Sequence, residues 1–197
     1  MISYYKDVLD VIRDSVESIP IQDYEQLISE CVDVLRRGGK IIASGLGKNV
    51  PICEKFVGTL NSLSIDARFL HTNTAVHGDL GMVGKNDMVL LLSKGGNTHE
   101  TVDLAECLKS RGTNTWLMTF TEKSKSAGVV DKQLVMRLQN EGDEWDIVPN
   151  NSTTVYLIVL QGIAIEIGKR MGITLDDFRV NHPGGGIGAR LSGKDLW

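Results

Sequence analysis

The stretch MVLLLSKGGNT (residues 88–98) joins a continuous apolar run to a glycine-rich turn with hydroxyl and amide side chains. A run of this kind is typical of a strand that is buried on both faces, as in parallel sheets. The turn is followed by helical periodicity from Thr98 to Arg111. Because a strand, a tight turn and a helix in this order form a β–α crossover, the stretch predicts an α/β fold.

The same alternation of β-branched runs and helical segments extends outward in both directions. It predicts a doubly wound, five-stranded parallel sheet with helices on both faces, a flavodoxin-like three-layer sandwich. With no linker or repeat, residues 1–197 are expected to form a single domain that begins with helices and ends in a glycine-rich, non-helical tail. Strands are expected at 40–44, 66–71, 88–93, 115–120 and 134–137, and helices at 4–19, 22–36, 49–63, 98–111, 124–130 and 152–171.

Composition excludes several classes of function. A net charge of −4 without a basic stripe argues against nucleic-acid binding. The longest apolar segment, from Val155 to Ile167, is interrupted by polar residues, so no membrane span is expected. Three widely spaced cysteines fit reduced thiols better than disulfides or a zinc site, and the N-terminus is charged where a signal peptide is apolar. These features predict a cytoplasmic protein.

Three loops are expected at the carboxyl edge of the sheet, at residues 44–48, 93–98 and 150–154. Glycines, hydroxyls and helix N-termini are the groups that cradle phosphate. Each loop also has a plainer interpretation: a strand-to-helix turn before Asn49 as a cap, a capping box of Asn97 with Glu100, and helix capping by Ser152 and Thr153. Three such loops at one edge favour a bound anion.

Two histidines and one glutamate are candidates for proton transfer. His77 and His182 lie among glycines in loops, where an imidazole is available for acid–base chemistry. Glu141 follows the last expected strand. For its acidic neighbours a solvated loop is the favoured interpretation; these are Asp143, Glu144 and Asp146.

These residues resemble those of a known family. The motifs SGLGK (44–48), HGDLG (77–81), SKGGNT (93–98), PNNST (149–153) and HPGG (182–185) occur in the order found in sugar isomerase (SIS) domains. The chain is most similar to the isomerase domain of arabinose-5-phosphate isomerases. This resemblance covers nearly the whole chain and implies an aldose–ketose isomerase that interconverts D-arabinose 5-phosphate and D-ribulose 5-phosphate through an enediolate.

The resemblance also implies the site. The catalytic set would be Lys48, His77, Glu141 and His182. No metal and no cofactor is expected, and the protein would form a tetramer or dimer in which His182 reaches a neighbouring subunit's site. The expected phosphosugar-binding residues are Ser44, Gly45, Gly47, Ser93, Gly95, Gly96, Asn97, Thr98, Ser152 and Thr153.

Two positions depart from the family's pattern. Asn97 stands where a glutamate is usual, and Gly95 where a serine is usual. These departures leave open an isomerase of another sugar phosphate, such as a hexulose phosphate, or a non-catalytic phosphosugar sensor. The regulatory CBS modules that often follow this domain are not expected, because the sequence ends at Trp197.

Overall fold

The computed structural model describes residues 2–193 and contains the predicted five-stranded parallel sheet. The strand order is β2-β1-β3-β4-β5, the doubly wound arrangement in which the winding reverses between β1 and β3. The fold prediction is confirmed, and the last strand begins two residues earlier than expected. The strands are β1 (Ile41–Gly45), β2 (Ala67–His71), β3 (Met88–Leu92), β4 (Asn114–Thr119) and β5 (Lys132–Val135).

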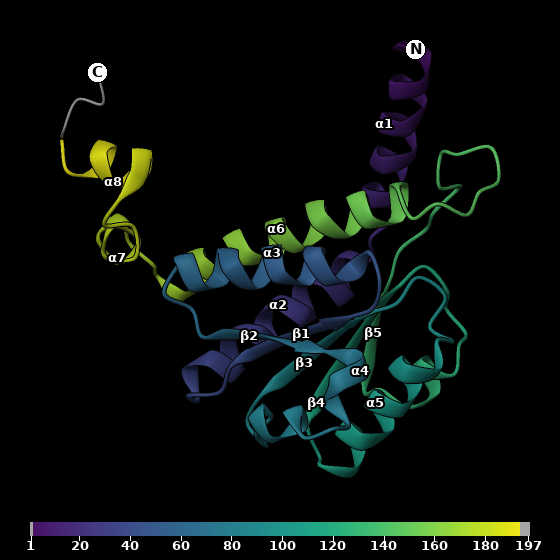
Figure 1. The fold of residues 1–197 in the computed structure, drawn as a ribbon, viewed down its shortest axis with the longest axis horizontal. Helices are drawn as coiled ribbons and strands as arrows, with labels where there is room; N and C mark the ends of the chain where they lie inside the picture. Colours follow the sequence, from purple (N-terminus) through teal and green to yellow (C-terminus); the bar gives the residue numbers. More distant parts are fainter. Residues whose placement is uncertain (1, 194–197) are drawn as a thin grey trace.

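Helices cover both faces of the sheet (Figure 1). On one face α2, α3 and α6 pack against alternate strand residues such as Ile41 and Ala43, and on the other α5 packs against Ile42 and Leu91. The longer helices are α1 (Ile2–Glu17), α2 (Ile21–Arg36), α3 (Asn49–Ser62), α5 (His99–Ser110) and α6 (Asn151–Met171). The short ones are α4 (Thr72–Ala75), η1 (Asp79–Met82), η2 (Ser126–Gly128), α7 (Leu175–Val180) and α8 (Gly185–Leu191).

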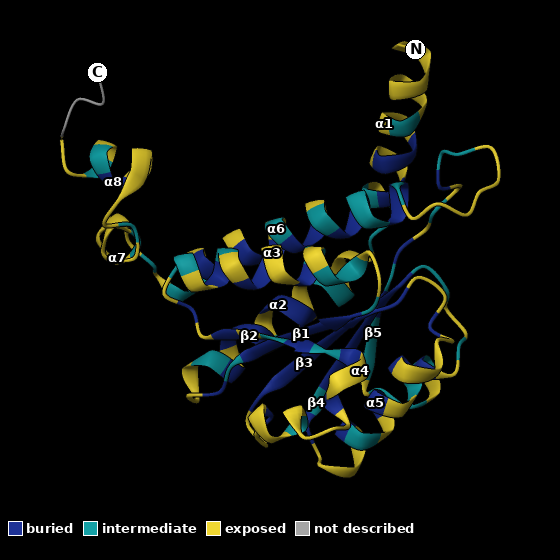
Figure 2. Cartoon of the chain, in the orientation of Figure 1, coloured by how far each residue is buried: buried dark blue, intermediate teal, exposed yellow. Residues whose placement is uncertain are grey.

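The two apolar strands at the centre are buried throughout. Every residue of β1 and of β3 is buried, and Figure 2 shows the buried side of α6 facing the sheet. Since helices cover both faces, these strands need apolar side chains at successive positions and not only at alternate ones. This burial explains why the residues MVLLL (88–92) are apolar at every position and do not alternate with polar residues.

Two asparagines that could cap helices by their spacing, Asn49 and Asn97, do not cap them. Asn49 Nδ2 donates to the Leu92 carbonyl over 3.2 Å, which ties the turn after β1 to the end of β3. Asn97 Oδ1 accepts from the Lys125 N–H over 2.9 Å, and the cap position of α5, Thr98, makes no side-chain capping bond. Both of these plainer interpretations are therefore wrong, because bonds to neighbouring loops take the two side chains.

The glycine-rich tail contains helices, contrary to the prediction of a non-helical segment. A capping box between Thr174 and Asp177 starts α7, and α8 follows from Gly185. A Cβ at Gly188 would lie 2.7 Å from the His182 carbonyl oxygen, so glycine lets α8 pack directly on the chain before it. Figure 1 shows α7 and α8 beyond the carboxyl end of α6, away from the end where α1 projects.

Candidate active site

The loop after β1 has the geometry expected of a tight glycine turn. A Cβ at Gly45 would lie 2.8 Å from the Asn49 Cβ and 3.2 Å from the Cys53 Sγ, so only glycine allows α3 to approach the end of β1. Gly47 has a φ of +55°, which also favours glycine. Lys48 follows at the surface, and within residues 2–193 its ammonium has no hydrogen-bond or ion-pair partner. The lysine is free to contact a ligand.

Ser44 is held by a residue that the sequence did not single out. Its Oγ lies 2.9 Å from Thr72 Oγ1, and both side chains are buried. The bond joins the end of β1 to the first residue of α4. Ser44 therefore aligns two loops at the carboxyl edge, and its hydroxyl already has a partner.

The loop after β3 is a compact turn with an open outer side. The Ser93 Oγ accepts the Gly96 N–H over 3.1 Å, inside the loop. Gly96 has a φ of +62°, and a Cβ there would lie 2.2 Å from Ser124 Oγ. By contrast, Gly95, Asn97 and Thr98 are exposed, and Gly95 has open space around it. Ser93 and Gly96 shape the loop, and the other three residues present it to solvent.

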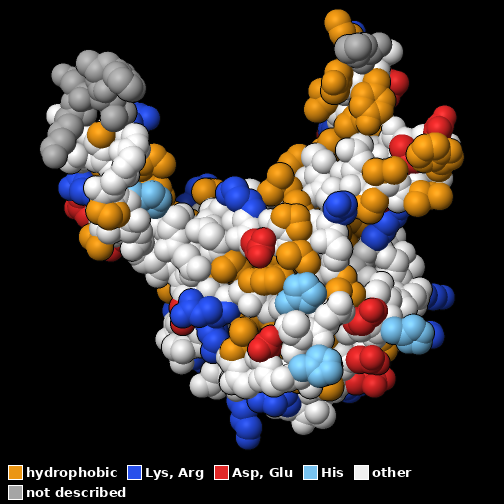
Figure 3. Space-filling model, in the orientation of Figure 1, with side chains coloured by type: hydrophobic (Ala, Val, Ile, Leu, Met, Phe, Trp, Pro, Cys, Tyr) orange, Lys and Arg blue, Asp and Glu red, His pale blue; other side chains and the backbone are white. Residues whose placement is uncertain are grey.

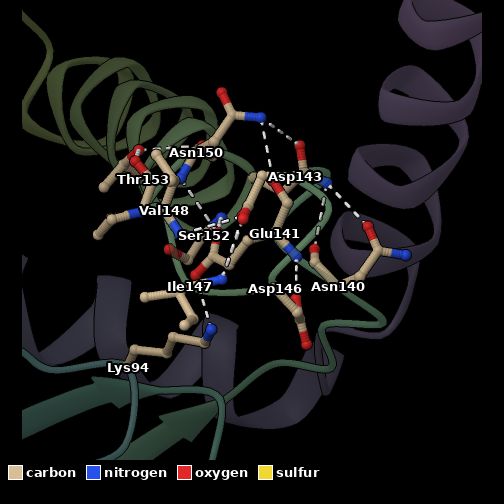
Figure 4. A network of polar contacts seen from close by, with 12 residues as sticks. Lys94, Asn140, Glu141, Asp143, Asp146, Ile147, Val148, Asn150, Ser152 and Thr153 are labelled. Atoms are coloured by element: carbon tan, nitrogen blue, oxygen red, sulfur yellow. Dashed lines mark hydrogen bonds and ion pairs between the residues drawn. The ribbon is translucent and has the colours of Figure 1, made fainter.

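A network of hydrogen bonds and one ion pair holds Glu141 in place (Figure 4). Its side chain is 0% exposed, and Oε2 accepts the backbone N–H groups of Ser152 over 2.9 Å and Asn150 over 3.1 Å. Oε1 accepts no well-aligned hydrogen bond, but it forms an ion pair with Lys94 Nζ at 2.7 Å. The first turn of α6 is thus capped by a carboxylate from another loop, whereas Thr153 donates its hydroxyl to the Asn150 carbonyl over 3.0 Å. The plainer interpretation of this loop, hydroxyl capping by Ser152 and Thr153, is therefore not what the structure shows.

This environment stabilises the ionised form of Glu141. Burial raises the pKa of the carboxyl, but the bonds from Lys94, Ser152 and Asn150 outweigh burial and hold the pKa below its ordinary value. The positive end of α6 favours the same charge state. Glu141 is therefore an anion in the ligand-free protein.

The acidic loop that follows is structured and not merely solvated. The Asp143 carboxylate accepts N–H groups of Trp145, Ile147 and Val148, at 3.0, 3.1 and 3.0 Å. Asp146 Oδ1 accepts the Glu141 N–H over 2.6 Å. For Asp143 and Asp146 the solvated interpretation is corrected, because both hold the loop that carries Glu141.

His77 is exposed and lies after α4 at the same edge of the sheet. It lines a cavity of about 300 Å³ together with Thr72, Asn73, Glu100 and Asp103. The histidine side chain makes no hydrogen bond within the described part of the chain. A histidine beside carboxylates in a cavity is suited to proton transfer.

His182 does not join these residues within one chain. It stacks on the Phe178 ring with centroids 3.9 Å apart, and its Nδ1 lies 2.8 Å from the Phe178 carbonyl oxygen. The neighbouring Asn181 donates to the Ser62 carbonyl over 3.2 Å, at the end of α3 far from β1. The structure thus brings Lys48, His77 and Glu141 to one edge and places His182 at the other.

Sequence reasoning missed Lys94, Thr72 and Glu100. Lys94 lies inside the SKGGNT motif, in which the glycines and hydroxyls alone were sufficient to predict an anion-binding loop. Thr72 gave no signal, and Glu100 was considered only as the partner of Asn97 in a capping box, because a glutamate in a first helical turn is a common structural residue. Only the packing of loops from separate strands shows what these three contact.

The five-stranded parallel sheet, with helices on both faces and glycine and hydroxyl loops at its carboxyl edge, defines a doubly wound α/β protein. The SIS domain profile matches residues 34–166, and the chain belongs to this family. Its relatives include the arabinose 5-phosphate isomerase KdsD of Pseudomonas aeruginosa, 34% identical over 91% of this chain and 55% of that protein. KdsD of Escherichia coli K12 is 30% identical over 94% of this chain and 57% of that protein. The chain spans about half the length of these curated relatives.

Solved structures agree with this assignment. The protein c3406 of E. coli CFT073, in complex with arabinose 5-phosphate, superposes with a TM-score of 0.85 at 30% identity, over 91% of this chain and 94% of that one. A Bacteroides fragilis protein described as a phosphosugar isomerase involved in capsule formation gives 0.87 at 30% identity, over 95% and 99%. Within residues 2–193, no helix is both long and apolar enough to cross a membrane.

Proposed function

We propose that the protein is an aldose–ketose isomerase that interconverts D-arabinose 5-phosphate and D-ribulose 5-phosphate. The observation that carries the proposal is Glu141, a buried and ionised carboxylate at the sheet edge that also bears Lys48, His77 and the loop after β3. A base, a cation and an anion-binding loop are the groups this reaction requires. The names of the KdsD relatives and the arabinose 5-phosphate complex of a structural neighbour support the same substrate.

In the proposed reaction, the sugar binds through its phosphate and opens its ring with help from His77 or His182. Glu141 then removes a proton from C2 of the aldose and returns it to C1, and the reverse reaction begins at C1. Lys48 and one histidine stabilise the negative charge that develops on the enediolate oxygens. The bound phosphate orients the carbon chain of the sugar. It contacts Gly95, Asn97 and Thr98, in a loop that Ser93 and Gly96 shape, and Ser152 and Thr153 lie on its other side.

A second subunit completes the site in this proposal. His182 lies at the wrong end of α6 to reach Glu141 in its own chain, so it serves a neighbour in a dimer or tetramer. The face between the projecting α1 and the α7–α8 end is hollowed, with hydrophobic side chains toward α1 (Figure 3). Exposed apolar residues of the two helices include Tyr5 and Leu9 of α1 and Ile158 of α6. A neighbouring copy that covers them would bury this apolar surface.

Free thiols at Cys31, Cys53 and Cys107 are consistent with a reducing compartment, and we propose a cytoplasmic location. A second candidate function is a phosphosugar sensor or an isomerase of a hexulose phosphate. Gly95 and Asn97, both exposed in the loop after β3, favour this alternative because they remove a hydroxyl and an acid from the ligand's surroundings.

Proton NMR in D₂O tests the proposal. Each of the two pentose phosphates, incubated with pure protein, is expected to convert into the other with deuterium entering at C1 or C2. A hexulose phosphate panel run in parallel separates the alternatives. If only a hexulose phosphate is turned over, it replaces the two pentose phosphates as the substrate. If the sugar phosphates of the panel bind without turnover or deuterium exchange, the protein is a sensor.

A further inference from the structure

Lys94 joins the loop after β3 to the buried Glu141. Its side chain is 45% exposed, whereas that of Glu141 is 0% exposed, and their charged atoms lie 2.7 Å apart. The backbone of Lys94 is fixed separately: its carbonyl accepts the Phe120 N–H over 3.0 Å and the Thr119 hydroxyl over 2.9 Å. The ammonium can therefore change partner through rotations of its side chain while the loop stays in place.

The position of Lys94 gives it a second candidate partner. It lies between Ser93 and Gly95, within the loop proposed above to bind the phosphate. A phosphate in this loop carries up to two negative charges, against one on Glu141. Because Coulomb attraction scales with the product of the charges, a bound phosphate competes with Glu141 for the ammonium.

Glu141 keeps its orientation if the ammonium leaves. Oε2 remains bonded to the N–H groups of Ser152 and Asn150, so the carboxylate stays in place at the first turn of α6. Oε1 has no other partner in the part of the chain that the structure describes, and it is the atom that becomes available to accept a proton. Loss of a neighbouring cation also makes a carboxylate more basic.

We propose that Lys94 is a positioning residue that occupies Oε1 of Glu141 in the free protein and moves to the substrate's phosphate on binding. The inference rests on the proposed function and adds to it a residue and an order of events. Glu141 becomes a base only when the phosphate loop is filled. Proton transfer from the substrate carbon then breaks a C–H bond and forms an O–H bond at Oε1, and the same proton or one from solvent returns to the adjacent carbon.

The test measures binding and not turnover. The probe is D-arabinitol 5-phosphate, which has no carbonyl group and cannot isomerise, titrated calorimetrically with D-arabinitol as the control without phosphate. If phosphate and Glu141 compete for Lys94, the substitution Glu141→Gln removes the competitor and raises the affinity for the probe about fivefold or more. Lys94→Met should lower the affinity for the probe about tenfold. Lys94→Arg, which keeps the charge, should bind the probe nearly as well as the wild type does.

The double variant separates competition from indirect effects. In the Lys94→Met background, Glu141→Gln should no longer tighten the probe, because the shared cation is gone. Tightening that persists there, or a Lys94→Met protein that binds as wild type does, would overturn the inference. A purely structural ion pair would leave probe affinity unchanged in Lys94→Met and Lys94→Arg alike, and this result counts against the proposal even if Glu141→Gln fails to fold.

The outcomes distinguish this inference from the proposed function. If the wild-type protein binds the probe and the Lys94 substitutions do not change the affinity, the proposed exchange of partners is wrong. The isomerase proposal is not affected by that result. If all the predicted binding results are obtained but the protein converts no sugar phosphate, the isomerase proposal is wrong. The exchange of Lys94 between Glu141 and the phosphate then still holds. Wild-type protein that does not bind the probe would contradict both.

Discussion

His182 and Glu141 lie beyond opposite ends of α6, a helix of 21 residues. At a rise of about 1.5 Å per residue, the helix separates them by roughly 30 Å. A site that contains both side chains therefore needs two chains. This geometry gives the proposed oligomer a direct functional test.

The first prediction concerns mixed oligomers. Glu141→Gln and His182→Ala are each expected to be inactive alone, but co-expression should restore a substantial fraction of activity. A mixed assembly contains sites that combine an intact Glu141 from one subunit with an intact His182 from the other. The measurement is isomerase activity of tagged, purified hetero-oligomers. If His182 acted within its own chain, the mixture would stay as inactive as its components.

The second prediction concerns Glu141 as the base. Glu141→Gln should lower kcat by roughly 10²–10⁴-fold, because an amide cannot take up the proton, and KM should not rise. Glu144→Gln is the matched control, since Glu144 is exposed in the same loop and makes no ion pair within residues 2–193. Steady-state kinetics measure both variants, and a melting curve shows whether α6 remains formed. Near-normal turnover in Glu141→Gln would assign the base elsewhere.

The third prediction compares two adjacent glycines. Gly96→Ala should destabilise the loop after β3 and weaken phosphosugar binding, because its φ is +62° and the new Cβ would lie 2.2 Å from Ser124 Oγ. Gly95→Ala should leave the stability of the loop unchanged, since nothing lies within 4 Å of a Cβ there. Thermal unfolding and ligand titration of the two variants test this difference. Equal effects would mean that the loop is not ordered as described.

The fourth prediction concerns acid stability. Asp87 is 4% exposed and lies 2.6 Å from Lys40 Nζ, and its Oδ2 accepts the Gly84 N–H over 2.7 Å. Burial raises the pKa of Asp87, but these bonds outweigh burial and place it below the ordinary 3.8. The ionised carboxylate thus contributes stability above about pH 4 that is lost as pH falls through the lower folded pKa.

Asp87→Asn should therefore lower Tm at neutral pH and reduce the loss of Tm on acidification. Unfolding curves between about pH 7 and about pH 2.5 measure this change in slope. Asp7→Asn, at an exposed position of α1, is the control and should leave the slope as in wild type. A slope that Asp87→Asn does not change would show that this ion pair has no linkage to folding.

The sheet could be predicted well because local chemistry decides it. MVLLL can be buried at five successive positions only between two helical layers, and the glycines after β1 and β3 mark where the chain turns. Parallel pairing followed from the helical segments that separate successive strands. None of these inferences requires knowledge of a distant contact.

The site was harder to predict because its contacts join loops that are far apart in sequence. The capping of α6 by Glu141 and the bond between Ser44 and Thr72 leave no periodic pattern. Asn49 and Asn97 looked like helix caps because local spacing allows it, but each bonds to another loop. Local reasoning identified candidate residues and could not assign their partners.

The capping of α6 by Glu141 gives this carboxylate two roles that a single substitution removes together. The first turn of α6 needs an acceptor for its free N–H groups whatever the protein binds, so Glu141 contributes to folding as well as to the proposed chemistry. Lys48 and His77 are exposed and make no side-chain hydrogen bond within the described residues. Replacing these two residues therefore tests the proposed chemistry with little expected change in the free energy of unfolding.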